Sequence, residues 1–176
     1  MFKLCGIIAK FLVRFLKNCK RILGIDPGLC HTGWGVIDIK GNMLTPVAHG
    51  VISSKADEMA MRLNEIFKGI SDVIGMYSPD EAAVEEVFLN KNPGSTLKLG
   101  MARGVALLAP AHFGLPVGEY SANKVKKSVV GVGHATKEQV SHMVCILLPK
   151  AAPVKLDAAD ALAVAICHAH HIGAPV

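Results

Sequence analysis

The sequence RILGIDPG, at residues 21–28, is the feature around which the rest of the chain can be organised. Its apolar run from Ile22 to Ile25 predicts a buried β-strand, and Pro27-Gly28 predicts a turn directly after that strand. Asp26 lies between the two, so a carboxyl group is expected at the carboxyl end of a buried strand. Acidic side chains are seldom buried unless they are paired or functional, so Asp26 is a candidate site residue.

The residues that follow predict further strands and a helical crossover. The segments 33–40 and 46–53 predict two strands, and the short turns between the first three strands favour an antiparallel meander. Apolar residues then recur at helical spacing from Met59 to Ile74, and Ser78-Pro79 predicts the end of that helix. A strand predicted at 81–87 follows this long crossover, so it should run parallel to an earlier strand.

The second half of the chain predicts mostly helices. A helix is expected from Gly94 to His112, followed by a short strand from Val117 to Tyr120. Further helices are expected to start near Ala122, at Thr136, where Thr136 and Gln139 form a capping-box pattern, and at Asp157. The expected fold class is therefore α/β, with a five-stranded mixed sheet flanked by helices.

Length and composition favour a single domain with a polyanionic partner. A chain of 176 residues can bury a full core, and its net charge of +5 favours an anionic partner, although many basic proteins bind nothing anionic. The five cysteines are odd in number and lack CxxC spacing, which favours a reducing compartment over a disulfide framework or a zinc site.

Residues 1–20 form a basic, amphipathic N-terminal extension of unknown role. They contain no acid, and their apolar residues have helical spacing. Charges at Lys10 and Arg14 interrupt the apolar run, so neither a membrane span nor a secretory signal is predicted. An organelle transit peptide, a surface helix, an overlong start and an extra capping helix all remain open. The folded domain is expected over residues 21–172.

Three other carboxylates, those of Glu85, Asp157 and Asp160, could lie close to Asp26 in the folded chain. Glu85 closes the apolar run 82–85, and parallel pairing of its strand with the first would place Glu85 beside Asp26. Asp157 and Asp160 share the first turn of an almost entirely apolar helix. Taken alone, these two acids are more typical of a helix N-terminus, which an acidic side chain stabilises.

Crowded carboxylates cannot all ionise unless a cation neutralises them, and oxygen ligands favour Mg²⁺ or Mn²⁺. Such a cluster suits phosphodiester hydrolysis with two metal ions. The sequence has no identifiable Ser-His-Asp or Cys-His nucleophile set, and it has no GxxxxGK[ST] loop, which disfavours a P-loop ATPase.

Basic and aromatic residues in the second half are candidate nucleic-acid contacts. The candidates are Phe88, Lys91, Lys124, Lys126, Lys127 and Lys137. The lysines could follow a phosphate backbone, or they could belong to a solvated helix face. Phe88 could stack on a base, or it could fold back into the core.

Gly100 and Gly104 have a spacing that lets another helix approach closely. Tight packing on the chain's own sheet and contact with a second subunit are equally compatible with this pattern.

Several motifs together resemble those of the bacterial RuvC Holliday-junction resolvase family. They lie in order over roughly residues 21–170: ILGIDPG at 22–28, TGWGV at 32–36, AVEEVF at 83–88, LKLGMARG at 97–104, VVGVG at 129–133 and DAADALA at 157–163. The resemblance implies a ribonuclease-H-like fold, a homodimer and the use of Mg²⁺. It also implies paired nicks in strands of like polarity at a four-way DNA junction during recombination and repair, with a branch-migration helicase as partner.

The resemblance also implies roles for individual residues. Asp26, Glu85, Asp157 and Asp160 would be the catalytic acids and metal ligands. Phe88 would probe the junction, and Lys126 and Lys137 would contact the DNA backbone. The extension at residues 1–20 lies outside the family pattern.

Two other functions remain open at this point. One is a ribonuclease-H-like nuclease of the YqgF type that acts on structured RNA, and the other is a junction-binding dimer that has lost catalysis. A sugar-kinase-like ATPase normally needs two such domains, for which this chain is too short. A bacterial resolvase would be cytoplasmic, and organellar import through the extension is a further possibility.

Overall fold

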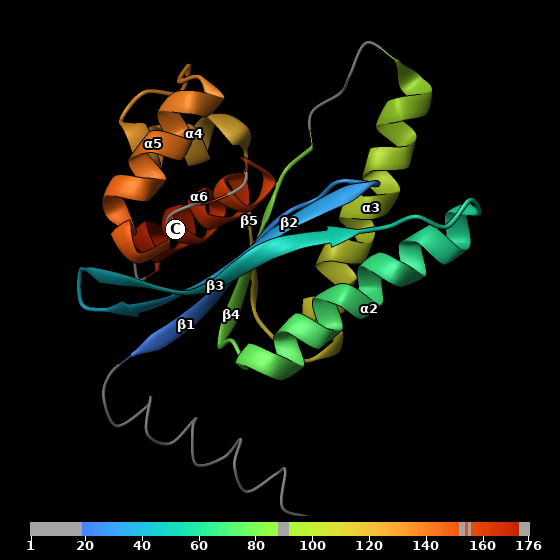
Figure 1. The fold of residues 1–176 in the computed structure, drawn as a ribbon, viewed down its shortest axis with the longest axis horizontal. Helices are drawn as coiled ribbons and strands as arrows, with labels where there is room; N and C mark the ends of the chain where they lie inside the picture. The colour runs from blue at the N-terminus through green and yellow to red at the C-terminus, as the bar shows by residue number, and fades with distance from the viewer. Residues whose placement is uncertain (1–18, 88–91, 152–153, 155, 173–176) are drawn as a thin grey trace, which may run out of the picture.

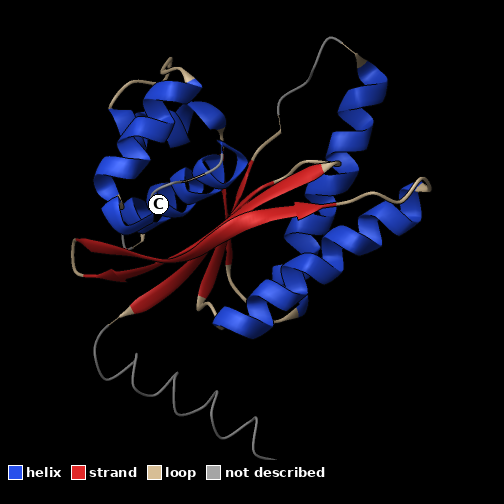
Figure 2. Ribbon diagram, in the orientation of Figure 1, coloured by secondary structure: helices blue, strands red, loops and turns tan. Residues whose placement is uncertain are grey.

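A mixed β-sheet forms the centre of the molecule. The computed structural model describes residues 19–87, 92–151, 154 and 156–172. Its five strands are β1 (Lys20–Asp26), β2 (His31–Lys40), β3 (Met43–Ser53), β4 (Glu81–Glu85) and β5 (Val117–Tyr120), in the spatial order β3-β2-β1-β4-β5. The first three strands are antiparallel, whereas β4 runs parallel to β1 and β5 runs parallel to β4. The expected meander and the expected parallel fourth strand are both confirmed (Figure 2).

Helices cover both faces of this sheet (Figure 1). On one face lie α2 (Met59–Tyr77) and α3 (Pro93–His112), which pack against each other. On the other face lie α4 (Ala122–Val130), α5 (Lys137–Leu147), the 3₁₀ turn η1 (Pro149–Ala151) and α6 (Leu156–His171). Each face has its own cluster of buried apolar side chains, so the sheet separates two halves of one core.

Element boundaries differ from the sequence expectation in a few places. Strand β3 begins at Met43 and includes Pro46, opposite a shift in register between Val36 and Ile37. Because β3 is an edge strand, a proline can occupy it at an irregularity without breaking an inner ladder. Strand β4 ends at Glu85, two residues earlier than expected, which leaves Glu85 at its tip. The capping box at Thr136 and Gln139 is confirmed.

The N-terminal extension lies almost entirely outside the described residues. The structure describes the chain from residue 19, and β1 starts at Lys20. Within the described part of the chain, no helix combines the length and the apolar character needed to cross a membrane.

Helix α6 lies unusually close to the backbone of β1 and β2. A Cβ atom built on Gly24 would lie 2.1 Å from the carbonyl oxygen of Ala161, and one built on Gly33 would lie 2.0 Å from that of Asp157. Both distances are shorter than any ordinary contact, so only glycine lets the helix approach this closely. The contact places the first turn of α6 above the carboxyl end of β1.

We predict that Gly24→Ala destabilises the protein, because the new methyl group must push α6 away from β1. The expected loss is about 1–3 kcal/mol of unfolding free energy, measured by urea denaturation. Gly75→Ala on α2 is the matched control, because a Cβ at Gly75 would meet nothing within 4 Å. That control should be neutral or stabilising by up to about 1 kcal/mol. Equal midpoints for Gly24→Ala and the parent would disprove the close contact.

Candidate active site

Asp26 and Glu85 end two adjacent parallel strands. The parallel register pairs Ile25 with Val84, so the next residue on each strand is one of the two acids. Neighbouring strands lie about 4.8 Å apart, which is close enough for one ion to reach both carboxylates. The sequence expectation that these two acids are neighbours is confirmed.

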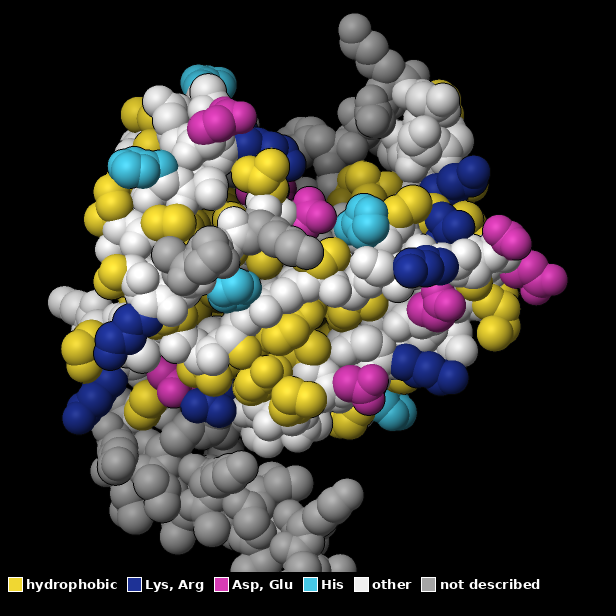
Figure 3. All heavy atoms as spheres, viewed as in Figure 1, with side chains coloured by type: hydrophobic (Ala, Val, Ile, Leu, Met, Phe, Trp, Pro, Cys, Tyr) yellow, Lys and Arg dark blue, Asp and Glu magenta, His cyan; other side chains and the backbone are white. Residues whose placement is uncertain are grey.

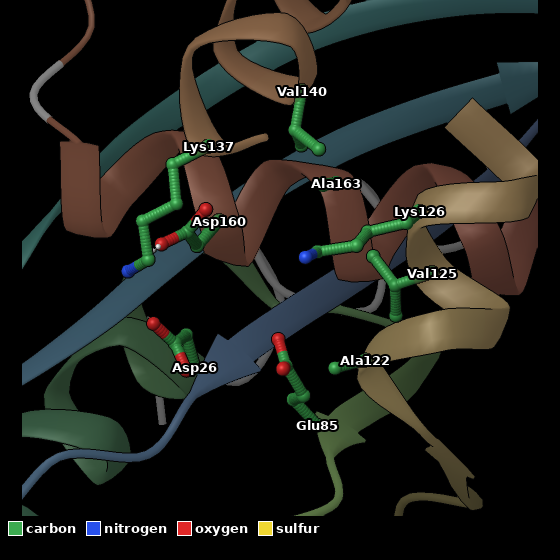
Figure 4. A pocket seen from close by; sticks show the side chains of 9 residues that line it. All are labelled: Asp26, Glu85, Ala122, Val125, Lys126, Lys137, Val140, Asp160 and Ala163. Carbon is green, nitrogen blue, oxygen red and sulfur yellow. Dashed lines mark hydrogen bonds and ion pairs between the residues drawn. The ribbon is translucent and has the colours of Figure 1, made fainter. Parts of the chain in front are cut away.

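A hollow of about 180 Å³ opens above these two strand ends. Asp160 reaches it from α6, Lys126 from α4 and Lys137 from α5 (Figure 4). The other described residues of the lining are apolar: Ala122, Val125, Val140 and Ala163. Three carboxylates and two ammonium groups from five different elements therefore share one pocket, which we call the acid pocket.

Asp157 does not line the acid pocket. It lines a neighbouring hollow together with His31, Ser53 and other residues of β2 and β3. Residues three positions apart on a helix differ by about 60° in direction, which is enough to point them to different sides of the contact with the sheet. The expectation that all four acids converge on one point therefore holds for three of them. The charge of Asp157 still acts on Asp26 and helps to raise its pKa.

Burial and mutual repulsion make two of the acids hard to ionise. Burial, then the nearby carboxylates of Glu85 and Asp160, raise the pKa of Asp26 to about 8. Burial, then repulsion from Asp160, raise the pKa of Glu85 to about 7. Lys137 opposes both shifts, and both shifts persist in its presence. The pocket therefore has a deficit of positive charge.

The donor chemistry of the acid pocket fits a divalent metal ion. Its ionisable acceptors are all carboxylate oxygens, which hard cations such as Mg²⁺ prefer. Among the described residues, no three Asp, Glu, His or Cys side chains are close enough together to form a closed metal cluster. The fit therefore rests on the type of the donors and on their raised pKa values, not on a finished coordination geometry.

Lys137 and Lys126 are the two lysines at the acid pocket. Lys137 donates a hydrogen bond from Nζ to Oδ2 of Asp160 over 3.1 Å, and this bond raises the pKa of the lysine. The side chain of Lys137 is 68% exposed, whereas that of Asp160 is only 17% exposed. Lys137 thus reaches into the pocket from the surface, where it is also accessible to an anionic ligand.

The other candidate lysines lie further out. Lys124 places its ammonium group 5.0 Å from the centre of the Tyr120 ring, and Lys127 is exposed on α4. On the face shown in Figure 3, Lys and Arg side chains are scattered, and a band of hydrophobic side chains crosses the middle. Phe88 and Lys91 lie outside the described residues, so their proposed DNA contacts stay predictions.

Gly100 and Gly104 face open space. A Cβ atom at either position would meet nothing within 4 Å, and both residues are exposed on α3. Close packing on the chain's own sheet, one of the two explanations of this spacing, is therefore wrong. The other explanation, contact with a second subunit, stays a prediction.

Sequence reasoning missed His31 and Ser53, which line the hollow beside Asp157. The two residues are far apart in the chain and belong to no recognisable motif. Antiparallel pairing of β2 with β3 brings them opposite each other, so only the strand register could have identified them.

Comparison with known proteins identifies the family. The family model for the crossover junction endodeoxyribonuclease RuvC matches residues 22–168. The chain belongs to the RuvC family. The matched range contains all four acids together with Lys126 and Lys137.

Individual RuvC proteins agree with this assignment. RuvC of Paramagnetospirillum magneticum is 63% identical over 154 residues, covering 87% of this chain and 93% of that protein. RuvC of Rhizobium rhizogenes is 56% identical over 160 residues, covering 90% and 94%. The solved structure of T. thermophilus RuvC in complex with a Holliday junction substrate matches with a TM-score of 0.79 and 36% identity, covering 87% of this chain and 94% of that one. The expected ribonuclease-H-like fold is confirmed.

We predict that Asp26→Asn makes the metal-free protein more stable at alkaline pH. The raised pKa of Asp26 means that its stabilising contribution is complete below about pH 4 and is lost as the pH rises through about 8. The amide cannot ionise and keeps this contribution. In the presence of chelator, the thermal midpoint of the variant should match that of the parent near pH 4 and exceed it at pH 9. The expected difference is roughly 2–4 °C for each kcal/mol of relieved repulsion.

An equal midpoint at pH 9, or a lower one, would contradict this electrostatic account. Asp72→Asn, which changes an exposed acid on α2, controls for the loss of one negative charge and should show no such pH-dependent gain.

Proposed function

We propose that this chain is a metal-dependent endonuclease that resolves four-way DNA junctions by paired nicks in strands of like polarity. The observation that carries the proposal is the acid pocket itself, in a chain of the RuvC family: Asp26, Glu85 and Asp160 meet there beside Lys126 and Lys137. A RuvC relative of similar fold has been solved with a Holliday junction substrate. Recombination and repair are the processes that supply such a substrate.

The carboxylates are proposed to hold Mg²⁺, with two ions per site and with Mn²⁺ able to substitute. Asp26, Glu85 and Asp160 would be its ligands in the acid pocket, and Asp157 would act from the neighbouring hollow. A bound divalent ion supplies Lewis-acid stabilisation of the phosphoryl group and lowers the pKa of a bound water. The raised pKa values of Asp26 and Glu85 support this proposal, because both acids gain from a nearby cation.

The lysines would bind phosphates of the DNA backbone and hold them close to the carboxylates of the acid pocket. Lys137 already neutralises Asp160, and its exposed stem lets the ammonium group reach a phosphate from the same position. Lys126 lines the pocket on the other side from Lys137 (Figure 4). The contact with the DNA strand would be extended by Lys124 and Lys127 on α4 and by Lys91. Phe88 would stack on a base beside them. The apolar side chains of Val125 and Val140 also line the pocket.

A dimer is proposed because a four-way junction needs two coordinated cuts. A two-fold axis would present two identical pockets to the two strands of like polarity. The surface of α3 supports this arrangement, because an exposed stripe of Leu97, Met101 and Leu108 runs beside Gly100 and Gly104. A branch-migration helicase is proposed as a further partner, and the bacterial cytoplasm as the place of action.

Two alternative functions can be distinguished from this proposal by the substrate that is cut and by whether cutting occurs in Mg²⁺. A nuclease for structured RNA would cut folded RNA in preference to a four-way DNA junction. A catalytically silent junction-binding dimer would bind the junction and leave it intact in Mg²⁺. The carboxylates of the acid pocket favour catalysis over silent binding.

We predict that changing any one of Asp26, Glu85, Asp157 and Asp160 to its amide abolishes junction cleavage. Each amide keeps the shape of the acid and removes the charge that a metal ion needs. Binding of a synthetic four-way junction, measured in Ca²⁺, should be unchanged or tighter because repulsion of phosphates is reduced. Asp72→Asn should cut at the parent rate. Near-normal cutting by Asp26→Asn would remove the acid pocket from the mechanism.

We also predict that Gly104→Leu weakens dimerisation and converts paired cuts into single nicks. A leucine side chain at this position would hold a facing helix away from α3, whereas its Cβ atom would meet none of the described residues within 4 Å. Sedimentation measures the oligomeric state, and a cruciform plasmid separates linear product from nicked circles. Gly75→Leu, on the exposed surface of α2, is the control and should remain dimeric. A fully dimeric Gly104→Leu that makes paired cuts would show that the interface lies elsewhere.

A further inference from the structure

A second hollow, of about 470 Å³, lies beside the acid pocket on the side of β2 and β3. Asp157 forms one wall, and its backbone lies against Gly33 of β2, which pairs with Asp26 of the acid pocket. The hollow therefore adjoins the point at which a strand would be cut. Its size lies within the range of pockets that bind small organic groups. Its lining consists of His31, His49, Gly50, Val51, Ser53, Asp157 and Ala158.

The lining of this hollow differs in charge from that of the acid pocket. Two lysines line the acid pocket, whereas the described residues that line the second hollow carry imidazole, hydroxyl and carboxylate groups and include neither lysine nor arginine. A phosphate there would be repelled by the carboxylate of Asp157. An uncharged group with hydrogen-bonding edges and a flat apolar face suits this lining better, and a nucleotide base has both.

The imidazole groups of His31 and His49 can offer a donor and an acceptor to an occupant of the hollow. Nε2 of His49 lies 2.9 Å from the carbonyl oxygen of Ala151, so it must carry the ring proton, and Nδ1 of a neutral His49 is an acceptor. Nδ1 of His31 lies 3.3 Å from Oγ of Ser53. With the hydroxyl donating to that nitrogen, Nε2 of His31 carries the proton and can donate to a base. Side chains that combine donors and acceptors are those that discriminate base edges.

The strand pairing holds His31 and Ser53 in place. The two residues face each other across the antiparallel ladder of β2 and β3. Gly33, next but one to His31 on β2, lies against the backbone of Asp157. The same sheet thus fixes the position of the two polar side chains relative to α6, so an occupant of the hollow would be aligned with the acids.

We propose that this hollow is a base-reading subsite, in which His31 and Ser53 contact a base next to the scissile phosphate and thereby contribute to the sequence preference of cleavage. This inference rests on the proposed function, because it assigns a substrate group to the neighbourhood of the same acids. His31 and Ser53 are specificity-determining residues in this account, and the acids remain the residues that act on the phosphodiester.

The test uses a library of four-way junctions with randomised nucleotides around the exchange point. The full chain is incubated with the library in Mg²⁺, and the cut products are sequenced. His31→Ala and Ser53→Ala should each change the ratio between favoured and disfavoured sequences by at least about fivefold, the lower end of the scale expected for losing one base contact. Ser53→Thr keeps the hydroxyl and should keep the parent preference. His142→Ala, which removes an exposed imidazole on α5, should leave preference and rate unchanged.

A structural role and a base-reading role give different results. If His31→Ala and Ser53→Ala slow all sequences by one common factor, or leave preference and rate unchanged, the subsite does not exist. The same library is also sorted by binding in Ca²⁺, which tests the subsite independently of cleavage. If the parent protein cuts no junction, the proposed function fails. The subsite is then upheld only if the bound sequences of the parent show a preference that the two variants lose.

Discussion

The contact between α6 and the glycines of β1 and β2 is the constraint on which the site depends. Gly24 and Gly33 have no side chain that could keep the helix away, so backbone atoms of α6 lie directly against the sheet. This approach brings Asp160 over the carboxyl ends of β1 and β4, where Asp26 and Glu85 are already adjacent. A bulkier residue at either glycine would lift the helix and separate the acids. The fold and the site are thus set by the same contact.

The cost of this arrangement is electrostatic. Burial raises the pKa values of Asp26 and Glu85, and their proximity to Asp160 raises them further. Two lysines partly balance the three carboxylates: Lys137 donates a hydrogen bond to Asp160, and both Lys137 and Lys126 lower the pKa of Glu85. Repulsion among the carboxylates lowers the stability of the protein without ligands. A bound cation would relieve this repulsion and would also attract the phosphates of a DNA strand. The same crowding that weakens the metal-free protein is what makes the pocket suited to phosphodiester chemistry.

Much of this was predictable from the sequence, because strand order follows from simple rules. The crossover before β4 required a parallel strand, and that pairing placed Asp26 beside Glu85. The features that could not be predicted depend on the directions of individual side chains and on the register of paired strands. The spacing of Asp157 and Asp160 indicated a shared helix face, yet their side chains line different hollows. The pairing of His31 with Ser53 requires the register of β2 and β3, and the pairing of Lys137 with Asp160 requires the packing of α5 on α6. The spacing of Gly100 and Gly104 allowed two explanations, and the structure excludes packing of these glycines against the chain's own sheet.

The acid pocket has a deficit of positive charge, which a bound divalent ion would correct. Asp26 and Glu85, with pKa values of about 8 and about 7, should both carry protons for part of the time at pH 7. Binding of Mg²⁺ must displace these protons. Calorimetric titration with Mg²⁺ at pH 7, in buffers of different ionisation enthalpy, measures the number of protons released. We predict the release of about one proton or more per site, and a clearly smaller release in Asp26→Asn. Binding of Mg²⁺ with no proton release would contradict the account.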